Sequence, residues 1–188
     1  MNAPPDHVVM RQVREGDVEK LGVLFDRHHR TIFHFFLRLT GDRSGGEDLV
    51  QEVFLRILRF RNTYRSDAAF TTWMYQIARN VAADHYRKRK HDTREELPEE
   101  QEKEPVSREP NPGEWAEQRQ QAAMLRAALA RLSQDKRELL ILSRYQDLKY
   151  EEIARILSSN VATVKVRVFR ALQELGRIYF ELSRGKAS

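Results

Sequence analysis

Apolar residues recur at steps of three and four along most of this chain, which is the spacing of amphipathic helices. Before residue 92 the pattern predicts three main helices, over about 17–40, from Ser44 onward, and over 70–90, with a weaker one near 8–14. Gly41 suits the C-terminal stop of the first main helix, and Ser44-Gly45-Gly46-Glu47 is a capping-box pattern for the second. No segment alternates in the way of a strand, so we expect an all-α fold.

Residues 92–113 interrupt this periodicity. They hold four of the six prolines, with eight acidic side chains against three basic ones. A segment of this composition cannot bury enough apolar surface to offset its conformational entropy. We therefore expect a flexible, acidic, Pro-rich linker between two small helical domains, residues 1–91 and residues 114–188.

The C-terminal domain contains two short apolar patterns on either side of a turn, which predict a helix-turn-helix over 150–170. Asn160 is a good N-cap for the second helix. The outer face of that helix carries Thr163, Lys165, Val166, Arg167, Phe169 and Arg170. Such a helix fits the major groove of DNA, where cations read guanine edges and apolar groups contact thymine methyls. The alternative is an ordinary helical hairpin with a solvated basic face.

The helix over 70–90 joins aromatic and hydroxyl side chains in its first half to cations in its second. Aromatic rings stack on unpaired bases, and Lys and Arg bind phosphates. Phe70 and Tyr75 are candidate stacking or wedge residues, and we expect Trp73 in the core. The side chains expected to be exposed toward DNA are Tyr75, Gln76 and Arg79, with phosphate contacts from Arg87, Lys88, Arg89 and Lys90. The alternative assigns these positions to the core or to a solvated helix end.

Composition narrows the classes of function. The 188 residues carry a formal net charge of +5 and no cysteine, which removes disulfides, thiolate metal sites and a cysteine nucleophile. His28, His29 and His34 lack the four-residue step of helical zinc motifs, and there is no Gly-rich phosphate loop. We expect no cofactor, no small-molecule substrate and no enzymatic activity. The first ten residues lack an apolar core of signal-peptide length, and no apolar stretch is long enough to span a membrane. We therefore expect a cytoplasmic protein without membrane insertion.

Taken together, these segments resemble the extracytoplasmic-function group of bacterial sigma factors, within the sigma-70-type family. The resemblance is strongest in the pattern Phe-x-Thr-Trp-x-x-x-Ile-Ala-Arg-Asn at 70–80, followed by Asp84 and a run of cations. Segment 48–56 resembles the polymerase-docking region, and segment 150–170 resembles the reader of the minus-thirty-five element. The family is not enzymatic in itself; it directs core RNA polymerase to promoter DNA, and an anti-sigma protein is often a further partner.

The resemblance also implies roles for individual residues. The contact with core polymerase would involve Asp48, Gln51, Glu52 and Phe54. Contacts to the minus-ten element and promoter melting would involve Phe70, Thr72, Tyr75, Gln76, Arg79, Asn80, Arg87 and Lys88, with loop 62–69 helping to capture a flipped base. Minus-thirty-five DNA would meet Asn160, Thr163, Lys165, Val166, Arg167, Phe169 and Arg170. The acidic linker would thread toward the active-site cleft of the polymerase.

Three positions depart from the family pattern. Lys149 stands where a Ser or Thr usually caps the helix at Tyr150, Ser158 stands where the turn commonly has Gly, and Val166 stands where a small residue, often Ser, is common. The change at Val166 bears on which promoter sequence is read. Two other classes of protein stay open: a helix-turn-helix regulator that acts without polymerase, and a single-strand binder. Gel shifts of the free protein on duplex and single-stranded DNA would separate them.

Overall fold

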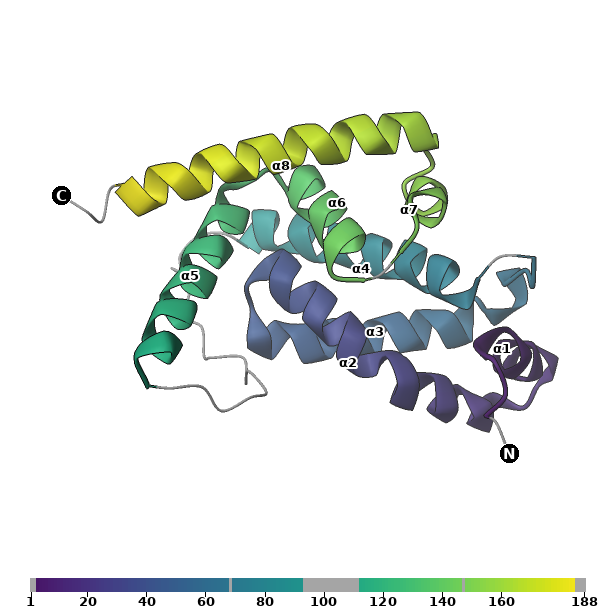
Figure 1. Ribbon diagram of the computed structural model, residues 1–188. Helices are drawn as coiled ribbons and strands as arrows, with labels where there is room; N and C mark the ends of the chain where they lie inside the picture. The colour runs from purple at the N-terminus through teal and green to yellow at the C-terminus, as the bar shows by residue number, and fades with distance from the viewer. Residues whose placement is uncertain (1–2, 68, 93–111, 147, 185–188) are drawn as a thin grey trace.

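The computed structural model describes residues 3–67, 69–92, 112–146 and 148–184 (Figure 1). Within these ranges no residue lies in a strand, and the all-α prediction is confirmed. The N-terminal half contains α1 (Asp6–Glu15), α2 (Leu21–Thr40), α3 (Arg43–Arg59) and α4 (Phe70–Asp92). The C-terminal half contains α5 (Pro112–Arg131), α6 (Gln134–Arg144), α7 (Tyr150–Ile156) and α8 (Val161–Arg184). Residues 93–111, most of the predicted linker, lie outside the described part of the chain.

The corner between α2 and α3 is built by two short-range devices. Gly41 has a positive φ of 76°, which glycine adopts without a Cβ penalty, and its N–H donates to the carbonyl of Leu37. Asp42 then caps α3, its carboxylate accepting from the N–H of Gly45 at 3.0 Å. The predicted capping box at Ser44 is wrong, because the cap is Asp42, two residues earlier, and the hydroxyl of Ser44 donates to Asp42 instead.

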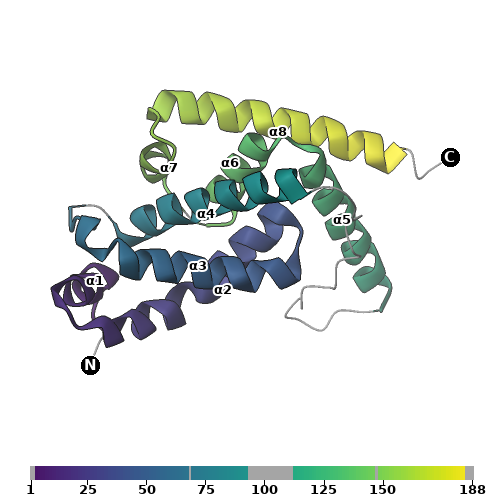
Figure 2. The same ribbon diagram turned by 180° about the vertical axis from the view of Figure 1, so that it is seen from behind.

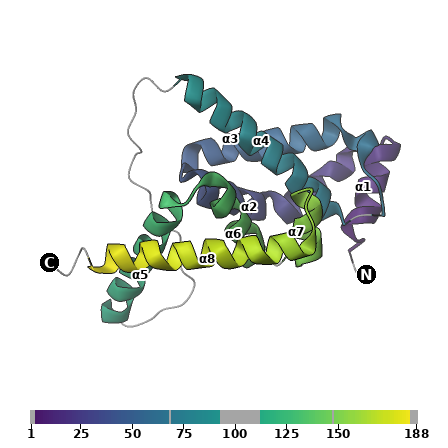
Figure 3. The ribbon, with the colours of Figure 1, turned by 90° about the horizontal axis from the view of Figure 1, so that it is seen from above.

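Helices α2, α3 and α4 lie alongside one another, and α1 packs near the beginning of α2 (Figure 2). The charged edge of α1 is tied to α2 because Asp6 accepts from Arg27 and contacts His28, each at 2.7 Å. His28 is thus a partnered histidine at the edge of the core. The long helix α8 packs on α5, α6 and α7, with α7 near its N-terminal end (Figure 3).

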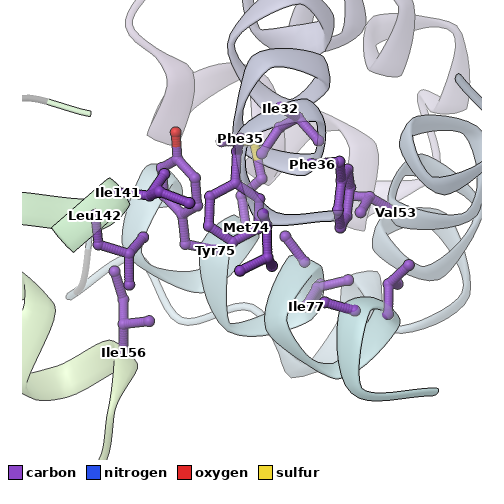
Figure 4. Packing of buried hydrophobic residues seen from close by; sticks show 14 of the residues in the cluster. Ile32, Phe35, Phe36, Val53, Met74, Tyr75, Ile77, Ile141, Leu142 and Ile156 are labelled. Carbon is purple, nitrogen blue, oxygen red and sulfur yellow. The ribbon is translucent and has the colours of Figure 1, made fainter. Parts of the chain in front are cut away.

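The two halves of the chain pack directly against each other. Helix α6 contacts α2, and α7 contacts α4. Figure 4 shows Ile141, Leu142 and Ile156 of the C-terminal half next to Tyr75 of α4, whose ring lies 5.5 Å from that of Phe35 of α2, centre to centre. Polar contacts add to this interface: Arg137 donates to the carbonyl of Leu39 at 2.8 Å, and the guanidinium of Arg38 lies 4.5 Å from the ring centre of Tyr145. The halves therefore share one continuous apolar core.

Candidate polymerase and nucleic-acid interfaces

The second helix of the helix-turn-helix begins as the sequence predicts. Asn160 caps α8, its side-chain oxygen accepting from the N–H of Thr163 at 2.7 Å. The turn before it places Ser158 at a φ of 48°, the only positive φ among the described residues other than glycine. Helix α7 lacks the usual Ser or Thr cap, and the backbone N–H of Lys149 donates instead to the carboxylate of Glu152 at 2.9 Å.

Helix α8 buries one face and exposes the other. Val164, Val168 and Ala171 are buried against α6 and α7. The exposed residues of its first half are Ala162, Thr163, Lys165, Val166, Phe169 and Arg170. Arg167 is half-buried, and its positive charge opposes in small part the rise that burial causes in the pKa of the Glu138 carboxyl. All residues that were predicted to contact minus-thirty-five DNA thus lie on or beside one helix surface, apart from this partly covered arginine.

Tyr75 is not exposed. Only 2% of its surface is accessible, its hydroxyl donates to the side-chain oxygen of Gln146, and burial raises the pKa of its phenol. Phe70 and Thr72 are also buried. Phe70 packs near His28, with ring centres 5.4 Å apart, so it belongs to the core rather than to an exposed wedge. The predicted exposure of Tyr75 is wrong for this arrangement, because α6, α7 and Gln146 between them cover that face of α4. Trp73, predicted to be in the core, is partly buried and packs against it.

Gln76 and Arg79 likewise face the C-terminal half of the chain. The side-chain amide of Gln76 donates to the carbonyl of Arg155 at 3.1 Å. Arg79 donates to Glu138 at 2.6 Å and to the carbonyl of Ile156 at 3.0 Å. Burial raises the pKa of Glu138, and the Arg79 guanidinium opposes that rise. These two side chains, predicted to face DNA, are therefore engaged by α6 and α7, and the expectation that they are exposed is wrong here.

The rest of the predicted minus-ten set is accessible. Asn80, Arg87 and Lys88 are exposed on the outer side of α4. Arg87 pairs with Asp84, which also accepts from Arg56 of α3 at 2.7 Å. The hydrogen bond from Arg56 is the main cause of the lowered pKa of Asp84. Asp84 thus fixes α4 to α3 directly below the basic segment, a link that periodicity alone did not reveal.

The predicted polymerase contact lies on α3 and is only partly exposed. Asp48 and Gln51 are exposed, Glu52 is half-buried and pairs with Arg56 at 2.6 Å, and Phe54 is buried. Phe54 supports the exposed Phe25 of α2, edge to face with ring centres 4.9 Å apart.

Two exposed apolar side chains on this face were missed. Leu55 is 61% exposed beside Gln51, and Phe25 stacks on His29 with ring centres 4.9 Å apart. An apolar residue on a polar helix face is the signal that identifies Leu55 in the sequence. We call Phe25, Asp48, Gln51 and Leu55 the α2–α3 face.

The described part of loop 62–69 borders a cavity of about 370 Å³ next to α1. Its lining residues are Asp6, His7, Ser66, Asp67, Ala69, Phe70 and Thr71. That this loop helps to capture a flipped base stays a prediction. Among the described residues there is no group of three or more side chains that could hold a metal ion. None of the described helices combines the length and apolar character of a bilayer span.

Solved structures share this fold. CnrH, in a complex with the cytosolic domain of CnrY, aligns over 92% of this chain and 96% of its own, with a TM-score of 0.69 and 21% identity. The sigma factor RpoE of Bartonella quintana, in a complex with the anti-sigma factor NepR, aligns over 84% of this chain and 94% of its own, with a TM-score of 0.68 and 23% identity. At these identities the likeness concerns the fold.

Sequence comparison is more specific. The family Sigma-70 region 2 matches residues 24–91, and Sigma-70 region 4 matches residues 122–175. The ECF RNA polymerase sigma factor SigX of Bacillus subtilis is 30% identical over 180 residues, covering 88% of this chain and 86% of SigX. EcfG of Rhodopseudomonas palustris is 33% identical over 146 residues, covering 78% of this chain and 77% of EcfG. SigE of Mycolicibacterium smegmatis is 32% identical over 152 residues, and the match spans 58% of that longer protein. The chain belongs to the extracytoplasmic-function group of the sigma-70 family of RNA polymerase sigma factors.

Proposed function

We propose that this sigma factor binds core RNA polymerase through the α2–α3 face, binds the minus-ten element with α4, and reads the minus-thirty-five element with α8. The observation that carries this proposal is the capped helix α8, whose exposed face bears Lys165 and Arg170. A helix that projects cations from a helix-turn-helix matches the shape and charge of the DNA major groove.

The α2–α3 face suits a protein partner better than DNA. Leu55 shares a face of α3 with the acidic Asp48 and the polar Gln51, and Phe25 of α2 packs on Phe54 of the same helix. Apolar anchors ringed by polar groups are the usual form of a protein-binding hot spot, and an acidic neighbour disfavours phosphate. We assign this face to a surface of core polymerase that is complementary to it.

The two DNA elements are too far apart for the observed packing of the two halves. Arg79 of α4 donates to the carbonyl of Ile156 at 3.0 Å. Asn160, which caps α8, follows Ile156 by four residues and therefore lies within about 15 Å of it. Elements centred about 25 base pairs apart are separated by about 85 Å along B-DNA. We therefore propose that α6 and α7 leave α4 when the holoenzyme forms, which would release Tyr75, Gln76 and Arg79 toward the minus-ten element.

This opening can be measured by energy transfer. The chain has no cysteine, so a pair introduced as Arg11→Cys on α1 and Gln173→Cys on α8 takes both dyes without other changes. Transfer should be high in the free protein and should fall when core polymerase is added. Unchanged transfer in a holoenzyme that initiates transcription would contradict the opening.

The function itself is tested by reconstitution with core polymerase and purified protein. Wild-type protein should co-elute with core and start transcripts at defined sites. Arg170→Ala should weaken use of the upstream element while leaving core binding intact, and equal loss of both would count against the role of α8. A free protein that binds duplex DNA specifically, without core, would favour the helix-turn-helix regulator instead.

Three further assignments follow from family membership. One of the two structures described above holds CnrH with CnrY and the other holds a sigma factor with an anti-sigma factor, and we propose an anti-sigma protein as a partner of this chain. We also place its action in the cytoplasm, where core polymerase works, and assign the chemistry of RNA synthesis to the polymerase rather than to this chain.

A further inference from the structure

Helix α8 exposes two apolar side chains at the centre of its basic half. Val166 is 49% exposed and Phe169 is 60% exposed, whereas the apolar residues on the opposite side of the helix are buried. Neither side chain packs in the core, so folding leaves their apolar surface in contact with water and gains no burial energy from it. An exposed apolar patch on an otherwise polar helix indicates a contact surface.

Charge around the patch indicates what it contacts. Residues 161–173 contain three cations, Lys165, Arg167 and Arg170, and no acidic residue. Lys165 and Arg170 are exposed beside Val166 and Phe169. The α2–α3 face, by contrast, combines its apolar side chains with Asp48. A patch with only cations around it fits a polyanion, and on this helix that polyanion is duplex DNA.

Major-groove edges of DNA offer one apolar group, the 5-methyl group of thymine. Val166 carries no hydrogen-bonding atom, so it cannot pair with the donors and acceptors of guanine, cytosine or adenine. Placed against those edges it would leave their polar atoms without water or a partner, which is costly. Val166 and Phe169 are three residues apart on one helix face, about 5–6 Å between Cβ atoms, which corresponds to one or two base-pair steps.

We propose that Val166 and Phe169 read the 5-methyl groups of two thymines, one or two base pairs apart, in the element bound by α8. The proposal rests on the function assigned to α8 above and adds the chemical feature that is recognised. Val166 supplies the selectivity that is particular to this chain, and Phe169 supplies the larger contact area. Lys165 and Arg170 hold the phosphates or guanine edges on either side.

Deoxyuridine tests this directly because it differs from thymidine only by the methyl group. Burying a methyl group is worth about fourfold in affinity. Random duplex DNA would first be enriched for binding to the reconstituted holoenzyme. Each thymine in the upstream element of the enriched sequence would then be replaced singly by deoxyuridine. We expect a three- to fivefold loss of affinity at two positions, separated by one or two base pairs.

Variants identify which side chain reads which methyl. In Val166→Ser the loss at one of the two positions should disappear while the other remains, and Phe169→Ser should give the converse. Phe180→Ser is the matched control, because Phe180 is 59% exposed on the same helix, about 16 Å further along its axis. That variant should keep both losses. Thermal unfolding by circular dichroism checks that all three variants fold.

The outcomes separate the two levels of the proposal. Absence of any deoxyuridine effect in the upstream element, or losses that persist unchanged in Val166→Ser and Phe169→Ser, would overturn thymine reading while leaving sigma function intact. Failure to enrich any sequence with the holoenzyme would overturn the assigned function and the thymine reading with it. Loss of core binding in Val166→Ser or Phe169→Ser would show that the patch is a protein-binding surface.

Discussion

The ion pair between Arg79 and Glu138 ties α4 to α6, and its removal gives a quantitative test of the interface between the two halves. Glu138 is buried, and its carboxylate accepts from Arg79 at 2.6 Å. Arg79→Met keeps the aliphatic packing but leaves the carboxylate with only the more distant Arg167. A buried charge without its partner is strongly destabilising, typically by 3–5 kcal/mol.

Protonation sets an upper limit to that loss. Neutralising a glutamate whose ordinary pKa is 4.5 costs about 3.4 kcal/mol at pH 7 and about 0.7 kcal/mol at pH 5. Arg167 offsets part of the penalty, so we expect Arg79→Met to lower the free energy of unfolding by about 2–3 kcal/mol at pH 7. In this variant the folded-state pKa of Glu138 lies above the unfolded value, so the folded state binds more protons. Its stability relative to wild type therefore rises as pH falls from 7 toward 4.5.

Urea unfolding followed by circular dichroism at pH 7 and pH 5 measures this difference. The matched control is Arg79→Met combined with Glu138→Gln, which lacks the charge and has the same lost hydrogen bond to Ile156. At pH 7, adding Glu138→Gln should restore most of the free energy of unfolding that Arg79→Met loses. At pH 5 it should change the free energy of unfolding very little, because the carboxyl is then readily protonated. An equal deficit of Arg79→Met at both pH values, or no rescue by Glu138→Gln, would refute the buried-charge explanation.

Three further substitutions probe the elements that position the sites. Ser158→Gly should stabilise the protein by about 0.5 kcal/mol in urea unfolding, because it relieves the positive φ at the turn, whereas Ser159→Gly should destabilise it. Asp42→Ala should cost about 1 kcal/mol by removing the cap of α3, and Asp42→Asn should retain most of it; equal loss in both would contradict a capping role. Leu55→Glu should weaken binding to core polymerase at least tenfold in a competition assay without changing the melting temperature, and unaltered affinity would show that Leu55 is not part of the polymerase contact.

The sequence predicts correctly those elements whose stabilising contacts lie within a few residues of one another. The helix-turn-helix was predictable because the cap at Asn160 and the buried stripe of α8 are set within a few residues. The stop at Gly41 was predictable for the same reason. The start of α3 was misplaced because Asp42 competes with Ser44 for the same cap, and both residue types suit that position.

The exposure of side chains on α4 was not predictable from periodicity. Tyr75, Gln76 and Arg79 are covered by residues 59 to 79 positions further along the chain. Helical spacing identifies the faces of α4, but it contains no information on which distant helix covers each of them. The same limit explains why the exposure of Phe25 was missed: it belongs to the apolar stripe of α2, but α3 does not cover that stripe completely. The division into residues 1–91, 92–113 and 114–188 stays a prediction.

Transcription in a reconstituted system tests the central claim most directly. Core polymerase would be combined with the purified chain on templates from the enriched sequences, and transcript 5′ ends would be mapped. We predict defined start sites that lie at a fixed distance downstream of the element read by α8 and that vanish when either core or this chain is left out. Transcripts whose start sites are the same with and without the chain would contradict the assignment.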